Sequence, residues 1–570
     1  MKTIFRFLIF LTAVTMFIGL SLNINKTSGE DNYKKKKINP GKIKKVSEEI
    51  SEKKAYSDFK SFELFNFNSN VSGTDDASDF TSAAALLNLK KEILNQILLK
   101  KQENILFSIP FSDKENLVLE LTQSFPTAED FSIVSKSGKN TERYINGLHY
   151  KGIIKGKENS IASVSIFRDF VMGVISDETG NYVLGSVKDQ DDNYSDRYIF
   201  YNDMDIEVIN KFKCRVDDYE KNLIRSMNAV QKKINDDQQD NPARLPVKIY
   251  FEADYQMYLD AASNQQNVAN FISGFFNSIM TIYQNEGLPV VISQIGIWDE
   301  PDPYINIHDS YQILQRFGQL NQDNFQGNVA HLISTRNENL GGIAYIRVLC
   351  GQYNENDLSG RFSFSNIEPG YNIYPTYSWT VNVVAHEMGH SFGSRHTHAC
   401  VWPIDGTIKA IDSCFTAEGG CFVNQRARIG TIMSYCHLRI QQGGGINLSF
   451  GFGQLPGDTI RLRYAEANCL DAALNSSEAP SAFDLAQNFP NPFNPTTRIV
   501  FALPVDANVN LKIYDITGKL VADLIQNKFY NTGFYDFNFN SSMYNLSSGI
   551  YFYKLDAGGF SEVKRMMMIK

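Results

Sequence analysis

The stretch HEMGHSFGSRH, from His386 to His396, constrains this chain of 570 residues more than any other feature. On a helix, His386 and His390 are one turn apart on the same face, so both imidazoles can reach a single metal ion. Gly393 lets the chain turn sharply out of the helix, and His396 then returns as a third ligand from another direction. Three protein ligands leave a fourth coordination position open, which is typical of catalytic zinc sites.

Glu387 follows the first of these histidines and lies one residue further round the helix, beside the metal position. Zinc lowers the pKa of water in its coordination sphere and polarises a carbonyl group. A neighbouring carboxylate can take the proton of that water and pass it to a leaving amine. The motif therefore predicts peptide-bond hydrolysis with one catalytic Zn²⁺ as cofactor and Glu387 as general base.

The same motif resembles that of the metzincin zinc peptidases, whose second mark is a methionine turn. The segment Thr431–Tyr435 (TIMSY) matches this turn, which implies that Met433 forms an apolar floor under the ligands. Tyr435 stands where some metzincins place a tyrosine that approaches the zinc. The resemblance implies a fifth ligand or a transition-state stabiliser, and the alternative is an ordinary core side chain. The segment 342–348 resembles the metzincin edge strand, to which an extended substrate can add as a further strand.

Within the metzincins, the cysteines and the preceding β-type region resemble the reprolysin-like branch, over roughly residues 115 to 470. That branch usually has Asp directly after the third histidine, whereas this chain has Thr397 followed by His398. The branch therefore stays open, and His398 is expected at the surface or beside a metal ligand. Calcium is a second candidate cofactor, although no calcium site can be identified from the sequence.

The charge of the chain limits which classes of molecule it is expected to bind. A net charge of −8 and a pI near 5.6 argue against nucleic acid as the main partner, because phosphate binding needs a basic field. Protein or peptide substrates are expected instead. The length implies several folded units.

The N-terminus resembles a targeting segment. Lys2 and Arg6 precede an apolar stretch from Phe7 to Leu22, which predicts a secretory signal peptide over residues 1–25. The alternative is a transmembrane anchor, but the stretch is short for a spanning helix, so no anchor is expected. The protein is predicted to be secreted or attached to the cell surface, and export makes disulfides permissible.

The rest of the chain divides by composition. Residues 26–244 are expected to form a propeptide, with a helix over Ala83–Leu99 and a β-rich unit from about 115 to 210. The segment 231–244 has almost no apolar residues and is predicted to be an exposed linker that is cut on activation. Strands interleaved with helices predict an α/β (α+β) catalytic domain over 245–473. Its expected strands are 247–251, 290–298, 329–334 and 343–349, and its expected helices are 268–283 and 378–393.

After a linker at 474–484, residues 485–570 contain short β-type runs between turns, which predict a small β-sandwich. Three segments, at 485–497, 511–519 and 548–553, resemble the type A sorting domain of the type IX secretion system. The resemblance implies export by that machinery through the outer membrane, followed by release or surface attachment. A carbohydrate-binding or adhesive sandwich is the alternative.

The cysteines raise two questions. Six lie in the catalytic segment and allow 15 pairings, among which the sequence does not choose. The resemblance to reprolysins implies a Cys350–Cys469 bridge, and we expect the other four to join loops around the site as Cys400–Cys436 and Cys414–Cys421. The seventh, Cys214, lies in the predicted propeptide. Because a thiolate is a good zinc ligand, Cys214 is either a switch that fills the open position and keeps a zymogen silent, or a buried unpaired thiol.

Taken together, these features predict a secreted zinc metalloendopeptidase made as a zymogen. The alternative is a surface adhesin whose metzincin-like domain binds partners without turnover. The presence of all three histidines and of Glu387 favours the enzyme.

Overall fold

The computed structural model describes thirteen stretches of the chain. They are residues 45–71, 76–138, 144–189, 193–206, 214, 245–338, 340–367, 373–421, 427–470, 482–488, 491–493, 495–544 and 546–569. The predicted signal peptide, the predicted cleavage linker at 231–244 and most of the linker at 474–484 lie outside these residues. Within the described stretches, no helix is long and apolar enough to cross a membrane.

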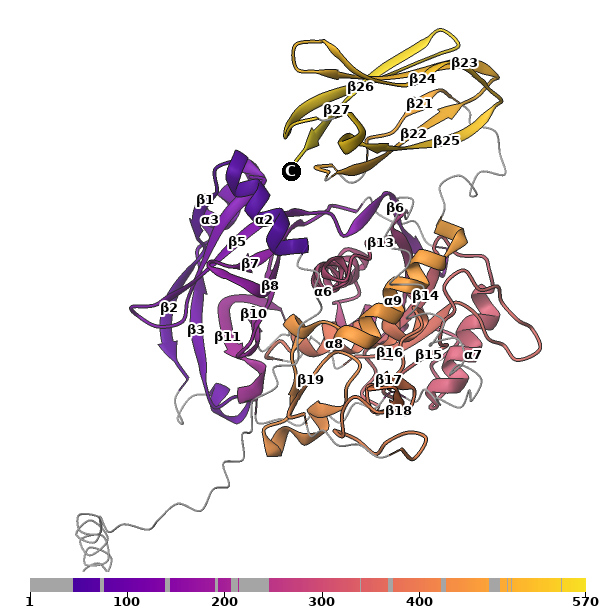
Figure 1. Ribbon diagram of the computed structural model, residues 1–570. Coiled ribbons are helices and arrows are strands. Elements are labelled where there is room, and N and C mark those ends of the chain that lie inside the picture. The colour runs from indigo at the N-terminus through magenta and orange to yellow at the C-terminus, as the bar shows by residue number, and fades with distance from the viewer. Residues whose placement is uncertain are drawn as a thin grey trace, which may run out of the picture. The chain divides into compact units, whose positions relative to one another are not determined.

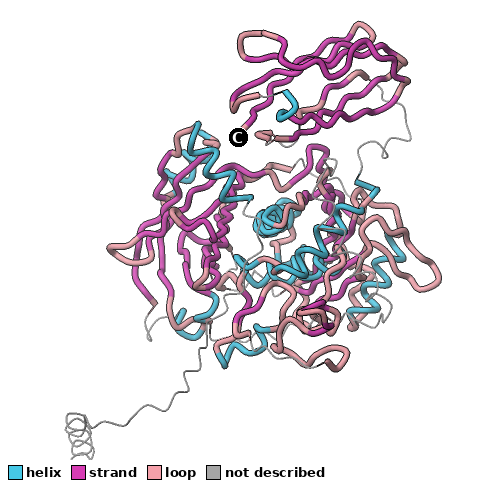
Figure 2. The backbone as a smooth tube through the Cα atoms, viewed as in Figure 1, coloured by secondary structure: helices cyan, strands magenta, loops and turns pink. Residues whose placement is uncertain are grey.

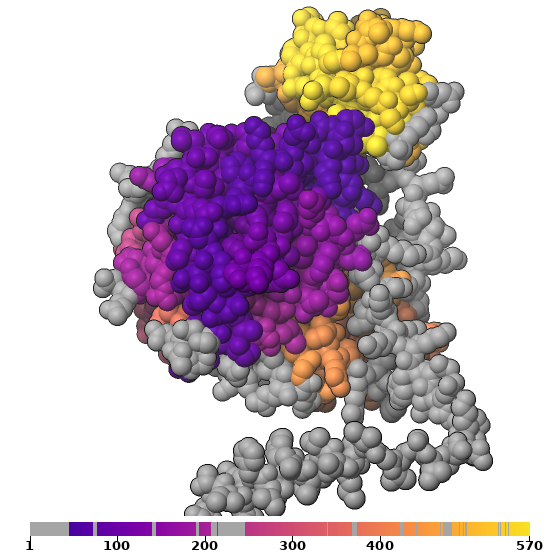
Figure 3. All heavy atoms as spheres, turned by 90° about the vertical axis from the view of Figure 1, so that its left-hand side faces the viewer, coloured from indigo at the N-terminus to yellow at the C-terminus, as the bar shows by residue number. Residues whose placement is uncertain are grey.

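A ten-stranded sheet dominates the N-terminal region, in the order β1-β4-β5-β7-β8-β9-β10-β11-β3-β2 (Figure 1). Its atoms, indigo to purple in Figure 3, form one continuous face. All neighbouring strands are antiparallel except the parallel pair β1 and β4. The elements of this region are α2 (Lys45–Tyr56), β1 (Lys60–Glu63), β2 (Phe65–Asn70), β3 (Ala84–Leu89), α3 (Lys91–Lys100), β4 (Asn104–Pro110), β5 (Asn116–Ser124), β7 (Leu148–Ile154), β8 (Lys157–Ile166), β9 (Val171–Asp177), β10 (Gly180–Lys188) and β11 (Tyr194–Asn202).

The helix expected over Ala83–Leu99 was partly wrong, because its first half is strand β3 and only its second half is helix α3. The Ala and Leu residues of this segment favour a helix locally. In the fold they instead pair with β11 on one side and β2 on the other, which buries Ala85 and Leu87. Pairing with two strands distant in sequence therefore overrides the local preference.

The second sheet has six strands in the order β15-β16-β14-β12-β13-β6. Five of them follow residue 245, and the sixth, β6 (Thr127–Ser135), comes from the N-terminal region. Neighbours are parallel, except that the edge strand β15 runs antiparallel to β16. The other strands are β12 (Val247–Ala253), β13 (Val290–Ile297), β14 (Val329–Ser334), β15 (Gly342–Ala344) and β16 (Phe362–Asn366).

Strand β15 is shorter than the expected strand over 343–349. The backbone turns at Arg347, whose φ is 59°. The N–H groups of Arg347 and Val348 donate to the carbonyls of His390 and Ser391 at the end of α8, at 2.9 and 3.0 Å. The chain leaves the sheet because these helix-end carbonyls accept its hydrogen bonds.

Helix α6 (Gln265–Asn285) packs against β7 and β8 of the ten-stranded sheet and against β13 and α8 of the catalytic region (Figure 2). It begins at Asn264, whose side chain accepts from the Asn267 N–H at 3.1 Å, a typical N-cap. Apolar residues recur at helical spacing, as the sequence predicts. The remaining helices here are α5 (Tyr255–Asp260), α7 (Ser310–Asn321), α8 (Tyr377–Ser391) and α9 (Gln454–Glu466), and the short strands are β17 (Trp402–Ile404), β18 (Thr407–Lys409), β19 (Ile429–Gly430) and β20 (Gly445–Ile446).

Three disulfides join the cysteines of the catalytic region: Cys350–Cys469, Cys400–Cys421 and Cys414–Cys436. The first is the expected pair, but the expected Cys400–Cys436 and Cys414–Cys421 bridges were wrong. The Cys400 N–H donates to the Glu418 carbonyl at 2.8 Å, which brings Cys421 close to Cys400. Cys414 and Cys436 share a small apolar cluster with Ile446. Cys214 is in none of the three bridges.

The C-terminal region has two sheets, β21-β22-β25 and β24-β23-β26-β27, whose buried side chains share one apolar core. This core contains residues from the C-terminal region alone. The strands are β21 (Asp484–Leu485), β22 (Thr496–Leu503), β23 (Ala507–Asp515), β24 (Leu520–Tyr530), β25 (Gly533–Asn540), β26 (Gly549–Ala557) and β27 (Phe560–Met568).

Candidate metal centre and active site

Helix α8 and the turn after it bring three imidazoles together. His386 and His390 lie one turn apart on α8, and Gly393, with a φ of 97°, turns the chain so that His396 returns to them. The Nε2 atom of His390 lies 3.2 Å from that of His386 and 3.1 Å from that of His396. All three rings are buried.

The other ring nitrogens fix the tautomers. The Nδ1 atoms lie at hydrogen-bond distance from oxygen acceptors: Ile432 O (2.7 Å) for His386, Ser394 O (2.9 Å) for His390 and Glu418 Oε1 (3.0 Å) for His396. Each Nδ1 must therefore carry the proton, which leaves a lone pair on each Nε2. Three lone pairs cannot donate hydrogen bonds to one another, so their convergence fits a cation. A set of imidazole nitrogens is one that Zn²⁺ prefers.

Cys214 joins this group from the N-terminal region. Its Sγ and the ligand nitrogens of the three histidines all lie within 4.8 Å of one another. The residue is buried and forms a parallel β-bridge with Gly342 on the edge strand β15. Its carbonyl accepts a hydrogen bond from the Tyr435 hydroxyl at 2.8 Å. The Cys214 backbone therefore lies along the edge that the sequence analysis assigned to extended substrate.

Glu387 is fully buried beside the cluster. Its Oε2 lies 3.4 Å from Cys214 Sγ, which donates to it, and its Oε1 has no hydrogen-bond partner among the described residues. Burial raises the pKa of the Glu387 carboxyl to about 8, although the hydrogen bond from Cys214 lowers it. Gly342 leaves room for this side chain, because a Cβ there would collide with Oε1.

The predicted methionine turn lies beneath the histidines. Met433 is fully buried, and a Cβ on Gly389 of α8 would lie 2.7 Å from its Sδ, so a glycine is needed for this close approach. The Met433 carbonyl accepts from the Thr397 N–H at 3.0 Å and from the Thr397 hydroxyl at 3.2 Å. Thr397, in the position where the resembled branch has Asp, therefore links the turn to the third histidine.

Tyr435, the last residue of this turn segment, lies close to the ligand set. Its hydroxyl is 3.3 Å from His396 Nε2, and it is the same hydroxyl that donates to the Cys214 carbonyl. Burial raises the pKa of this phenol well above its usual value. Tyr435 is therefore neutral and able to donate beside the metal position.

Glu418 was not among the predicted site residues. Its Oε1 lies 3.0 Å from His396 Nδ1 and 2.9 Å from His398 Nε2. The His398 ring is fully buried and stacks on His396 at a centroid distance of 4.8 Å, so the surface position considered for it was wrong. Two features of the sequence could have indicated Glu418. One is the absence of the Asp that usually follows the third histidine, and the other is the pair of cysteines that closes the loop carrying Glu418.

Comparisons with known proteins match two segments of the chain to family models. Residues 245–442 match the family model described as metallo-peptidase family M12, and residues 487–570 match a secretion system C-terminal sorting domain. Two curated relatives are disintegrin and metalloproteinase domain-containing proteins. One is adm-2 of Caenorhabditis elegans, 24% identical over 36% of this chain and 19% of its own length. The other is protein 19 of Mus musculus, 25% identical over 36% of this chain and 21% of its own length.

The match therefore spans about a fifth of each relative. A solved structure of catalytically inactive OgpA from Akkermansia muciniphila, in complex with an O-glycopeptide substrate, is 13% identical over 58% of this chain and 95% of that chain, with a TM-score of 0.20. A TM-score this low does not establish a shared fold. The two family models do assign the domains: residues 245–442 are a reprolysin-like metallo-peptidase domain of family M12, and residues 487–570 are a secretion-system C-terminal sorting domain.

Proposed function

We propose that this chain is a secreted zinc endopeptidase that is made as a zymogen and cleaves peptide bonds in extracellular proteins. The observation that carries the proposal is the convergence of three Nε2 lone pairs beside a buried carboxylate, Glu387. His386, His390 and His396 would hold the metal. Bound there, zinc would polarise the scissile carbonyl and make a water molecule more acidic.

Glu387 acts as general base, because the positive charge of bound zinc would favour the ionised carboxylate that burial alone disfavours. Its Oε1 accepts no hydrogen bond from the described residues and so is available to take a proton from water. The carboxyl then passes that proton to the leaving amine, which completes hydrolysis without a covalent intermediate. Tyr435, whose hydroxyl lies beside His396, donates a hydrogen bond to the oxyanion once the Cys214 carbonyl no longer accepts it.

Substrate binds along β15. This strand is at the end of its sheet, and its outer edge is bridged by Cys214. An extended peptide can add to the same edge by main-chain hydrogen bonds once that segment has left. The scissile bond would then lie next to Glu387, because Gly342 of the edge contacts this carboxylate.

Latency follows from the same contacts. In the precursor, Cys214 supplies the fourth ligand and its backbone covers the substrate edge, so both water and peptide are excluded. The N-terminal region is thus the propeptide, and cutting between residues 231 and 244 begins activation. The sorting domain directs the protein to the outside of the cell or to its surface.

Casein digestion by protein freed of residues 26–244 tests the proposal. We expect digestion that a chelator abolishes and added zinc restores. A zinc-loaded protein that binds protein partners but never cleaves casein, gelatin or a peptide library would overturn it and favour an adhesin.

A further inference from the structure

One strand of the peptidase-domain sheet belongs to the N-terminal region. Strand β6 pairs in parallel with β13, with Ile133 opposite Ile295 and Ser135 opposite Ile297. The N–H of Lys136 then donates to the Ile297 carbonyl at 2.8 Å. The β13 edge of the M12 domain is therefore covered by a segment that precedes the predicted cleavage linker.

An ion pair between a half-buried lysine and a buried carboxylate follows directly after this strand. Lys136 Nζ lies 3.0 Å from Oε2 of Glu252, whose side chain is fully buried. The ammonium also lies 5.7 Å from the Trp298 ring centroid, close enough for a cation–π contact. Glu252 belongs to β12, so the contact links the two regions through a charge in the interior of the peptidase domain.

A second acidic side chain of the peptidase domain accepts hydrogen bonds from the same segment. Asp299, which is buried, accepts hydrogen bonds from the hydroxyls of Ser135 and Ser137. Gln265 of α6 donates to the same carboxylate at 3.0 Å. The segment 127–137 thus offers one cation and two hydroxyl donors to two buried carboxylates.

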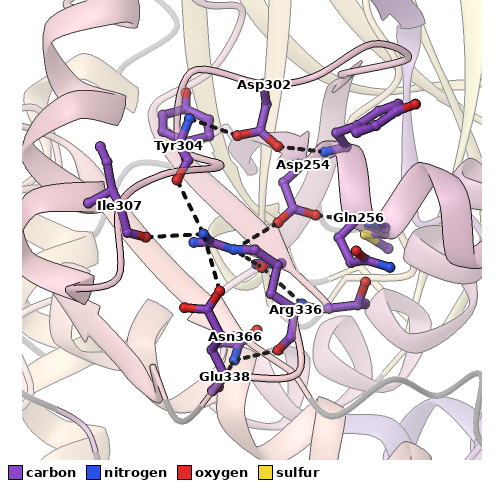
Figure 4. A network of polar contacts seen from close by, with 12 residues as sticks. Asp254, Gln256, Asp302, Tyr304, Ile307, Arg336, Glu338 and Asn366 are labelled. Atoms are coloured by element: carbon purple, nitrogen blue, oxygen red, sulfur yellow. Dashed lines mark hydrogen bonds and ion pairs between the residues drawn. The ribbon is translucent and has the colours of Figure 1, made fainter.

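Residues of the peptidase domain itself hold the Glu252 carboxylate in place. The hydroxyls of Tyr250 and Tyr304 and the Trp298 indole N–H all donate to Glu252 at 2.7 Å. The loop that carries Tyr304 is fixed in turn: Asp302 accepts from the Tyr304 N–H, and Arg336 donates to the Tyr304 carbonyl (Figure 4). No residue of the N-terminal region takes part in these bonds, so we expect the site to keep its shape when the segment leaves.

A second contact between the N-terminal region and the peptidase domain involves helix α6. On α6, the buried Asn277 accepts from the Ser124 hydroxyl at 2.6 Å and donates to the Tyr150 carbonyl at 2.9 Å. None of the three disulfides joins the N-terminal region to the peptidase domain. Apart from the polypeptide that links them, the described residues of the two regions are therefore held together by non-covalent contacts.

We propose that the β13 edge, with Glu252 and Asp299, is a strand-binding site for the segment 127–137, and that it keeps the propeptide bound after the linker is cut. Cys214 then stays beside the three histidines and the β15 edge, so the nicked enzyme is still silent. Activity begins only when the propeptide dissociates or is degraded. The inference rests on the proposed division into propeptide and peptidase, but not on catalysis.

The test uses the full chain with a recognition site for a specific protease inserted between residues 231 and 244. Glu387→Gln is included so that autolysis plays no part. After cutting, we expect the two fragments to elute together in size-exclusion chromatography at micromolar concentration and to give a one-to-one complex in native mass spectrometry. Fragments that separate at once under these conditions would overturn the inference.

Two variants test which side chains anchor the segment 127–137 to the peptidase domain. Lys136→Met leaves Glu252 buried without its cation, and we expect a roughly tenfold or larger rise in the dissociation constant of the fragments. Ser135→Ala with Ser137→Ala should weaken the complex in the same direction. Lys91→Met is the control, since Lys91 pairs with Asp196 inside the N-terminal region. If Lys136→Met and the double serine variant both match Lys91→Met, the proposed anchor is wrong. A tight complex of these fragments, together with no peptidase activity in the Glu387-containing chain after its propeptide is removed, would refute the proposed function alone.

Discussion

Cys214 Sγ lies 3.4 Å from Oε2 of Glu387, although 173 residues separate them in the sequence. The same sulfur lies within 4.8 Å of the ligand nitrogens of the three histidines. One thiol therefore contacts the proposed general base and borders the open coordination position. This arrangement supports the proposed latency of the precursor, and substitutions of Cys214, Glu387 and the histidines can test the role of each residue.

Glu387→Gln should keep close to one zinc per chain in the processed enzyme yet lose about two to four powers of ten in rate, because only the base is removed. His390→Ala should instead lose the metal. Zinc content and hydrolysis of a quenched peptide measure both, with the exposed Glu355→Gln as a control. Near-normal activity in Glu387→Gln, or undiminished zinc in His390→Ala, would refute the assignment.

Glu418→Gln should weaken zinc binding by about 10- to 100-fold, because the Glu418 carboxylate orients His396 through Nδ1 and makes its other nitrogen more basic. Competition with a chromogenic chelator measures the affinity. Thermal unfolding of the metal-free protein serves as the control, since a purely structural role would lower its melting temperature as well. An unchanged zinc affinity would show that Glu418 does not position the ligand.

The precursor should lose stability in acid through His149. Burial lowers the pKa of His149 to about 3, whereas in the unfolded chain it stays near 6.5. Below pH 6.5 the unfolded chain takes up a proton that the native chain does not, so the free energy of unfolding falls as the pH falls. The slope approaches about 1.4 kcal/mol per pH unit between pH 6.5 and 3.

His149→Gln should remove this slope while His331, whose pKa is also lowered to about 3 by burial, still contributes its own. Urea unfolding at several pH values between 4 and 7 measures the difference. Equal slopes in the parent and the variant would contradict the prediction.

Deleting Phe483 to Lys570 should leave a folded, activatable enzyme, because the apolar core of the C-terminal sheets contains no residue from outside that segment. In a host with the native type of secretion system, the truncated protein should stay in the periplasm. Fractionation and immunoblotting decide the matter. Normal appearance of the truncated protein outside the cell would remove the sorting role.

Helix α8, strand β14 and the histidine motif could be predicted from the sequence, because the residue spacing that indicates each of them lies within one short segment of the chain. The crossing of β6 into the peptidase sheet could not be found in this way. Its pairing with β13 joins Ile133 to Ile295, and no local pattern encodes the partner of an edge strand. Glu418 and the pairings Cys400–Cys421 and Cys414–Cys436 were missed for the same reason. The fold of the loop between Cys400 and Cys421 determines both the position of Glu418 and these pairings.

Whether Cys214 holds a zinc peptidase site silent can be measured as the activity of uncleaved Cys214→Ser precursor on a short quenched peptide. A neutral hydroxyl is a far poorer zinc ligand than a thiolate. The account predicts that the parent precursor is silent, that Cys214→Ser is active before any cleavage, and that adding Glu387→Gln abolishes this activity. A Cys214→Ser precursor as silent as the parent would contradict the thiol switch and leave blockage of the cleft by the propeptide as the cause of latency.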